Sequence, residues 1–257
     1  MNILFIGTSS GITEPGRFPS SILIQTQNHE LLVDCGDGFS QALLNQNLSF
    51  TQNINSIIIT HFHPDHLAGL PSLLIQMKLA GRTKPLTILV YHGLLLSLKK
   101  MLNIFNIFPE TYPFDITFFA LKEGLPKLDG GLEIKIKINT HIKPKQNAVI
   151  YDKVEFVSFS LLIIKNDKKV VYTSDIGSIN DLYLFNDNMV NCFITEISHI
   201  SVEEFIKACE FIKTEEIVIT HYQTKALEEI FDNEYISKRI EEKRIITAYD
   251  GLNLSIR

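Results

Sequence analysis

The stretch "SIIITHFHPDHLAGLP", Ser56–Pro71, places three histidines and an aspartate within six positions, directly behind a run of isoleucines. At ordinary His and Asp frequencies this pattern arises by chance in about one in 3000 chains of this length. His61 and His63 lie two residues apart after a predicted strand, so both can bind one ion. Asp65 and His66 point elsewhere, towards a second ion. Imidazole and carboxylate ligands without thiolate suit zinc best, with manganese, iron and cobalt as alternatives.

Four ligands cannot complete two metal sites, so further ligands should lie at other strand ends. His141 in "INTHIKP", Asp175 in "VVYTSDIG" and His221 in "EIVITHYQ" each stand where a buried strand surfaces. A lone histidine in such a position is usually structural, but the cluster from His61 to His66 makes a ligand role the better interpretation. By contrast, His29 in the polar turn "TQNHE" is predicted to be a solvated loop residue.

Three more polar residues are candidates for supporting roles. His199 precedes "SVEE", where Ser201 and Glu204 predict a capping box. The imidazole would then lie beside a helix N-terminus, either facing an anionic substrate or only neighbouring the cap. Asp34 ends a buried strand in "LLVDCGDG", where we expect it to bind the outer ring nitrogen of a ligand histidine, with plain turn chemistry as the alternative. Glu196 in "FITEIS" is interpreted as orienting His199.

Composition limits the class of protein. The chain has 257 residues, is 45% hydrophobic and carries a net charge of −5, with its lysines scattered and no basic patch. A surface that follows DNA is therefore not expected. No apolar run is long enough to span a bilayer, and the start reads as a strand and not as a signal peptide. Three widely spaced cysteines without a CxxC motif indicate reduced thiols in the cytoplasm.

Strands and helices alternate along the chain in two similar halves. Strands are predicted at Asn2–Gly7, Ser21–Gln25, Glu30–Asp34, Ser56–Thr60, Leu132–Ile138, Lys153–Ile164, Lys169–Thr173 and Glu216–Thr220, with two last strands joined by a turn at Tyr249–Gly251. Helices are predicted at Gly38–Asn45, Pro71–Leu79, Leu94–Phe105, Val202–Ile212 and Thr224–Phe231. This order favours an α/β fold of two β-sheets packed face to face with helices outside. We expect one domain of two halves, about 1–130 and 131–257, with the site along one edge of the sandwich.

The chain resembles the metallo-β-lactamase fold superfamily, and within it the ribonuclease Z branch, over nearly its full length. The resemblance is carried by "IGTSSGITEPGRFPSSILIQ", "LLVDCGDG", "THFHPDHLAGLPSLL", "LAGRTKPLTI", "VVYTSDIG", "HIS" and "VITHY", which arrive in the family's order. The fold implied is a four-layer αββα sandwich of two mixed sheets. A homodimer is also expected.

The resemblance also implies roles for individual residues. One zinc would be held by His61, His63 and His141, the other by Asp65, His66 and His221, and Asp175 would bridge both. Asp65 would in addition serve as the catalytic base towards the attacking water. His199 would match the family histidine that assists the leaving group.

Two departures from the family pattern matter. Ser174 stands where the family usually has glycine before the bridging aspartate. Members that process transfer RNA also carry a long Gly/Pro-rich arm between the third histidine and the bridging aspartate. Here the interval 142–174 contains no glycine and only Pro144. The missing arm weakens the case for transfer-RNA processing but leaves the two-metal chemistry intact.

The function predicted is therefore hydrolysis of nucleotide phosphodiesters by two metal ions, with small or cyclic nucleotides as the expected substrates. Processing of transfer-RNA 3′ ends, as by ribonuclease Z, is the first alternative. A lactone, ester or thioester hydrolase on the same fold is the second, and it would need a more apolar cleft and no histidine at the position of His199. A non-catalytic binding module would be favoured only if a metal ligand were missing.

Overall fold

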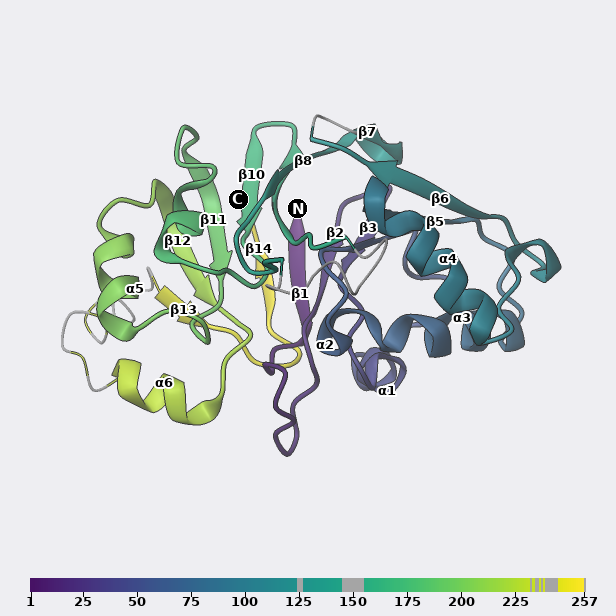
Figure 1. Ribbon diagram of the computed structural model, residues 1–257, viewed down its shortest axis with the longest axis horizontal. Helices are drawn as coiled ribbons and strands as arrows, with labels where there is room; N and C mark the ends of the chain where they lie inside the picture. The colour runs from purple at the N-terminus through teal and green to yellow at the C-terminus, as the bar shows by residue number, and fades with distance from the viewer. Residues whose placement is uncertain are drawn as a thin grey trace.

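Two mixed β-sheets lie face to face at the centre of the protein (Figure 1). The computed structural model describes residues 1–123, 127–144, 155–231, 233, 236, 238 and 245–256. Among them, the first sheet has seven strands in the order β14 (Asn253–Ser255), β1 (Asn2–Gly7), β2 (Ser21–Gln25), β3 (Glu30–Val33), β4 (Ser56–Ile59), β5 (Leu86–Tyr91) and β6 (Ile116–Leu121). The second, over the same described residues, has the order β13 (Ile245–Thr247), β12 (Thr214–Ile219), β11 (Val190–Thr195), β10 (Lys168–Tyr172), β9 (Phe159–Lys165), β8 (Leu132–Ile138) and β7 (Lys127–Leu128).

Helices cover the outer face of each sheet. The first sheet carries α1 (Phe39–Asn45), α2 (Pro64–Leu67), α3 (Gly69–Leu79) and α4 (Leu95–Ile104), and the second carries α5 (Val202–Cys209) and α6 (Thr224–Phe231). Short 3₁₀ helices are η1 (His92–Leu94), η2 (Pro109–Thr111), η3 (Asp129–Gly131) and η5 (Ile179–Tyr183). The result is the predicted four-layer αββα sandwich. None of the described helices is long and apolar enough to cross a membrane.

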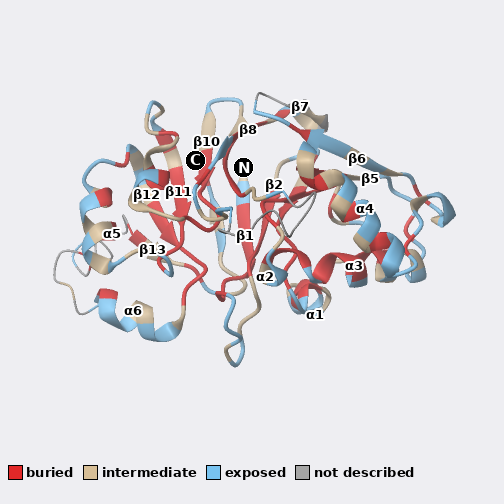
Figure 2. Cartoon of the chain, in the orientation of Figure 1, coloured by how far each residue is buried: buried red, intermediate tan, exposed pale blue. Residues whose placement is uncertain are grey.

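Alternation of side chains along the strands builds the layers. In β1, Ile3 and Phe5 point into the core between the sheets, whereas Leu4 and Ile6 point towards the helices. In β9, Leu161 belongs to the inner core while its neighbour faces the helices of the second half. Strands buried on both faces read as nearly continuous hydrophobic runs, which is why they were predictable. Figure 2 shows this burial concentrated in the strands.

The direction of the strands decides where the site can form. In the first sheet β3, β4, β5 and β6 are parallel, and in the second β10, β11, β12 and β13 are parallel. Because β9 is antiparallel to both β8 and β10, β8 also runs in the direction of β10. The carboxyl ends of all these strands therefore meet at the same edge of their sheet, which is the usual place for a ligand site in α/β proteins.

Several predicted elements differ in detail from the structure. Strands β5, β6, β7 and β11 add to those predicted, and α5 ends at Cys209 instead of Ile212. The predicted strand Lys153–Ile164 is shorter, since β9 begins at Phe159, and residues 153 and 154 lie outside the described residues. The last two strands do not form a hairpin: β13 pairs with β12 in the second sheet, and β14 pairs with β1 in the first. The turn at Tyr249–Gly251 thus carries the chain from one sheet to the other.

One buried cation fastens the segment that precedes β4 to the loop before β5. The Arg82 side chain is fully buried, and its five N–H groups donate to the backbone carbonyls of Phe50, Asn53, Ile54, Lys84 and Pro85, at 2.7 to 3.2 Å. Every donor of the guanidinium is paired, as a buried charge requires. Arg82 therefore fixes the approach to β4, the strand that ends at the histidine cluster.

We expect Arg82→Met to lower the free energy of unfolding by about 3 kcal/mol or more, because each buried carbonyl left without a donor costs about 1–3 kcal/mol. Urea unfolding followed by circular dichroism measures the change. Lys84→Ala is the matched control, since the Lys84 ammonium makes one exposed bond to Gln52 and should matter by no more than about 0.5 kcal/mol. Equal stability of the Arg82→Met and wild-type proteins would contradict this assignment.

Candidate metal centre

The candidate ligands all follow strands at the shared edge of the two sheets. His61 and His63 come after β4, and the short helix α2 adds Asp65 and His66. The second half supplies three more ligands, each after a different strand: His141 after β8, Asp175 after β10 and His221 after β12. The structure brings all seven residues together in two overlapping groups, within each of which the ligand atoms lie within 4.8 Å of one another.

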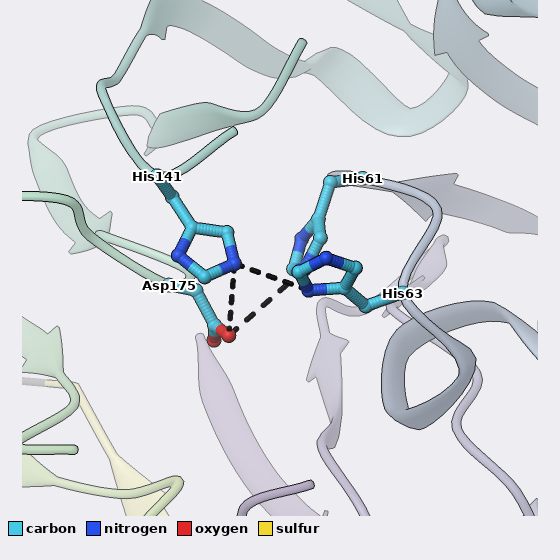
Figure 3. A group of neighbouring side chains, drawn as sticks. All are labelled: His61, His63, His141 and Asp175. Carbon is cyan, nitrogen blue, oxygen red and sulfur yellow. Dashed lines mark hydrogen bonds and ion pairs between the residues drawn. The ribbon is translucent and has the colours of Figure 1, made fainter. Parts of the chain in front are cut away.

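The first group joins His61, His63, His141 and Asp175 (Figure 3). His141 Nε2 lies 3.1 Å from His63 Nδ1 and 3.5 Å from Asp175 Oδ2, and His61 Nε2 lies 3.9 Å from the same oxygen. His61 is fully buried, whereas His63 is exposed. The group is thus closed on the side of the sheets and open towards solvent at His63.

The second group joins Asp65, His66, Asp175 and His221. Asp175 Oδ1 lies 3.1 Å from His66 Nε2 and 3.2 Å from His221 Nε2. Asp65 Oδ2 lies 3.6 Å and 3.7 Å from the same two nitrogens. Asp175 therefore presents one carboxylate oxygen to each group, which is the arrangement that a bridging ligand needs.

The donor atoms of the two groups fit divalent metal ions. His61 Nε2, His66 Nε2 and Asp175 Oδ1 are buried and make no hydrogen bond of good geometry with the described residues, although His66 Nε2 and Asp175 Oδ1 lie 3.1 Å apart. Buried polar atoms without partners are rare and point to a missing ligand. Burial also lowers the pKa of His61, His63 and His141, so their imidazoles are neutral and can offer a lone pair. Neutral imidazole with carboxylate is the donor set of zinc and related transition metals.

Asp34 holds the second group from behind. Its Oδ2 lies 2.7 Å from His66 Nδ1, so it binds the outer ring nitrogen as expected from the sequence. The carboxylate, which is fully buried, also accepts from the backbone N–H of Thr60 at 2.8 Å and from its hydroxyl. Burial opposes a positive charge on His66, but Asp175 and Asp34 outweigh it and raise the pKa of that imidazole well above its usual value. Asp34 thereby fixes which ring nitrogen of His66 faces the site.

Asn139 joins the ends of β8 and β10, a role that the sequence analysis missed. Its side-chain amide donates to the backbone carbonyl of Asp175 at 2.9 Å and to that of Thr173 at 3.2 Å. Since Asn139 lies two residues before His141, this amide sets the distance between a ligand of the first group and the shared carboxylate. No local pattern in the sequence marks this role, because the amide contacts the end of a different strand.

Ser174 has the left-handed backbone conformation, with φ of 56°. The glycine of the family pattern would adopt this conformation without strain, whereas a side chain in this region costs about 1–2 kcal/mol. The Ser174 hydroxyl offsets part of that cost with a hydrogen bond of 2.7 Å to the hydroxyl of Thr60, the residue that also binds Asp34. The departure from the family pattern is therefore accommodated locally.

Comparison with known proteins agrees with this geometry. The family model described as Anti-Pycsar protein Apyc1 matches residues 1–241. The chain belongs to that family. Ribonuclease Z of Clostridium beijerinckii is 34% identical over 140 residues, which cover 54% of this chain and 44% of the relative. The chain thus aligns with less than half the length of that curated relative.

Solved structures show the same fold for this Apyc1 family member. The metallo-β-lactamase fold protein YhfI of Bacillus subtilis superposes with a TM-score of 0.74 at 18% identity, covering 98% of both chains. Human tRNase Z, short form, gives 0.72 at 18% identity and covers 100% of both chains. The predicted metallo-β-lactamase fold and the ribonuclease Z-like branch are confirmed. Its homologues include ribonuclease Z enzymes, and its two groups of His and Asp side chains are placed so that they could hold metal ions.

His199 stands beside the first group and is held by Glu196. Its Nδ1 lies 2.9 Å from Glu196 Oε1, and its ring meets the His141 ring edge-on with centroids 4.7 Å apart. The hydrogen bond to the buried carboxylate raises the pKa of His199. The predicted capping box of Ser201 and Glu204 begins α5 just after it. Glu196 therefore holds the His199 ring through Nδ1.

The prediction that His29 is solvated was wrong. The side chain is buried, and its Nε2 lies 2.7 Å from the Ser56 hydroxyl. Ser56 is the first residue of β4, so His29 supports the strand that leads to the histidine cluster. The polar residues around His29 predict an exposed turn, but the turn folds the His29 side chain back onto the neighbouring strand.

We expect the purified protein to hold close to two equivalents of zinc or a similar metal, one for each ligand group. Asp175→Ala should lower the content of both, because it is the residue common to the two groups. His141→Ala should mainly lower the first and leave about one equivalent. Elemental analysis measures the content, with Asp187→Ala, an exposed aspartate, as the control. Full metal content in the Asp175→Ala protein would rule out a shared ligand.

Proposed function

We propose that the protein is a two-metal phosphodiester hydrolase that acts on small nucleotides, cyclic mononucleotides above all. The observation that carries the proposal is the pair of ligand groups that share the carboxylate of Asp175. Two divalent ions held there would polarise a phosphate and lower the pKa of a water molecule towards neutrality. They would also explain how a chain of net charge −5 can bind an anion.

Asp65 and His199 divide the proton transfers between them in this proposal. The Asp65 side chain is partly exposed, so it can orient a water and accept its proton at the mouth of the site. His199 lies at the opposite group, beside His141, and would donate a proton from Nε2 to the departing oxygen. Glu196 keeps that ring in place and favours its protonated form.

The size of the substrate is inferred from charge and from the interval between His141 and Asp175. Binding of a folded RNA requires several phosphate contacts from a basic surface or an arm. In this interval the described residues form β9 and β10, joined at Asn166, and the sequence offers no glycine. These features support small nucleotides. Processing of transfer RNA is the second candidate, supported by the ribonuclease Z relatives.

We further propose one domain of two halves that acts in the cytoplasm as a homodimer. Reduced thiols support the compartment: Cys35 and Cys192 are buried, and burial raises the pKa of both. Exposed apolar side chains on and just after α4, namely Leu96, Ile104 and Phe105, support a contact with a second copy.

If His199 acts on the leaving group, His199→Ala should lower kcat by about 10²- to 10⁴-fold with unchanged metal content. The loss should be smaller for bis-p-nitrophenyl phosphate, because p-nitrophenolate leaves without a proton. His92→Ala, at an exposed histidine of η1, is the matched control. A loss of equal size for good and poor leaving groups would instead indicate a binding or structural role. Turnover of esters or lactones that does not depend on His199 would favour the ester-hydrolase alternative.

The substrate proposal predicts a higher kcat/KM for cyclic mononucleotides than for precursor transfer RNA at physiological salt. The physical reason is the missing basic surface, which a small substrate does not need. Both rates are measured with the same metal-loaded protein. Efficient cleavage of precursor transfer RNA, with no turnover of cyclic nucleotides, would overturn the proposal and favour the second candidate.

A further inference from the structure

A cavity of about 470 Å³ opens beside the first ligand group, and His63 and His141 form part of its wall. This volume lies within the range of about 300–1,000 Å³ that is usual for small-molecule pockets. We infer that the cavity holds the base of a nucleoside phosphodiester, with Phe62, Phe156 and Glu155 as the residues that recognise it. The inference rests on the proposed function and adds the part of the substrate that lies away from the phosphate.

Two aromatic side chains from opposite halves of the chain line the cavity. Phe62 lies between the ligands His61 and His63, and it also packs against the core under the helices of the first sheet. Phe156 comes from the segment before β9, and its neighbour Val157 packs against the core between the sheets. The Phe62 ring is therefore anchored by the core, and both rings line the space that a flat partner would enter. Stacking on such rings is the usual way in which proteins bind bases.

Glu155 supplies a hydrogen-bond acceptor at the same wall, and its side chain is exposed to solvent. Its side chain lies across Gly93 of η1: a methyl group on Gly93 would be 2.7 Å from Glu155 Cγ and Cδ and 2.9 Å from Oε1. The absence of a side chain at Gly93 is thus what lets the carboxylate occupy this position. A carboxylate accepts hydrogen bonds and repels a carbonyl oxygen. The cavity should therefore prefer a base that presents an exocyclic amino group, as cytosine does, over one with a carbonyl there, as in uracil.

The remaining wall fits a nucleotide better than an apolar or acidic ligand. Lys143 stands at the cavity together with Glu155, so the wall carries one cation and one anion among apolar side chains. A fatty acyl group would make no use of either charge, and a carboxylate would be repelled by Glu155. A nucleotide offers a flat ring, N–H donors and an anionic phosphate within one small molecule.

The test is binding of the products cytidine 5′-phosphate, uridine 5′-phosphate and ribose 5-phosphate to the metal-loaded protein, measured by calorimetry. The wild-type protein should bind the cytidine compound about tenfold more tightly than either of the others. Phe156→Leu and Phe62→Leu should each weaken binding of cytidine 5′-phosphate by about tenfold and leave ribose 5-phosphate unchanged. Phe119→Leu, at an exposed phenylalanine of β6, is the control, and elemental analysis checks that metal content is retained.

Two variants separate the charge of Glu155 from its position. Glu155→Gln keeps the length of the side chain but can donate to a carbonyl oxygen, so it should remove the preference for cytidine over uridine. Gly93→Ala keeps the charge but displaces it, and should remove the preference as well. The pocket assignment is overturned if the three products bind equally, or if the variants weaken ribose 5-phosphate as much as cytidine 5′-phosphate.

Turnover distinguishes this inference from the proposed function. The kcat/KM ratio of cyclic CMP to cyclic UMP should follow the binding preference in every variant. Selective binding of cytidine 5′-phosphate without hydrolysis of any phosphodiester would leave the pocket standing and overturn the proposed function. The opposite outcome is hydrolysis of a cyclic ribose phosphate without a base at the same rate as cyclic CMP, with the same response to the variants. That result would leave the proposed function standing and overturn the pocket assignment.

Discussion

The carboxylate of Asp175 is the constraint around which the rest of the structure is arranged. It is buried at the end of β10 among four imidazoles, those of His61, His66, His141 and His221. Burial alone would raise its pKa, but His66 and His221 hold it well below the usual range, so the group is negative. A buried charge of this kind persists only when its partners are held in place. Strand ends from both sheets must therefore meet at this one point.

The supporting residues hold the strand ends in the positions that this buried carboxylate requires. Asn139 fixes the distance between β8 and β10, Asp34 fixes the ring of His66, and Thr60 joins Asp34 to Ser174. Thr60 and Ser174 belong to opposite sheets, and each of these residues lies next to a ligand, two positions from one, or in hydrogen-bond contact with one. These hydrogen bonds tie the ligand-bearing segments to strand ends of both sheets, so the sandwich itself positions the ligands.

A feature of the fold or of the site could be predicted from the sequence where neighbouring residues form a recognisable pattern. The cluster from His61 to His66 and the polar residues at strand ends are local patterns, and from them the sequence alone was enough to single out the residues that the structure brings together. The contacts of Asn139 and His29 are made across strands, and a single asparagine or histidine in a sequence carries no mark of such a partner. The cavity beside His141 was also hidden, because its aromatic walls lie far apart in the sequence. The crossing of the chain from β13 in the second sheet to β14 in the first was not predicted either, because two short strands joined by a turn are typical of a hairpin.

That crossing has a consequence for how the protein is made. Strand β14 completes the first sheet by pairing with β1, and the Asp250 carboxylate just before it binds the backbone N–H and hydroxyl of Thr8, 242 positions away. A ribosome that builds the chain from its N-terminus therefore exposes β1 as an open sheet edge until β14 has emerged. Pairings over such distances form slowly. During synthesis the first half is thus a sheet with an unprotected edge, the feature that invites aggregation of nascent chains.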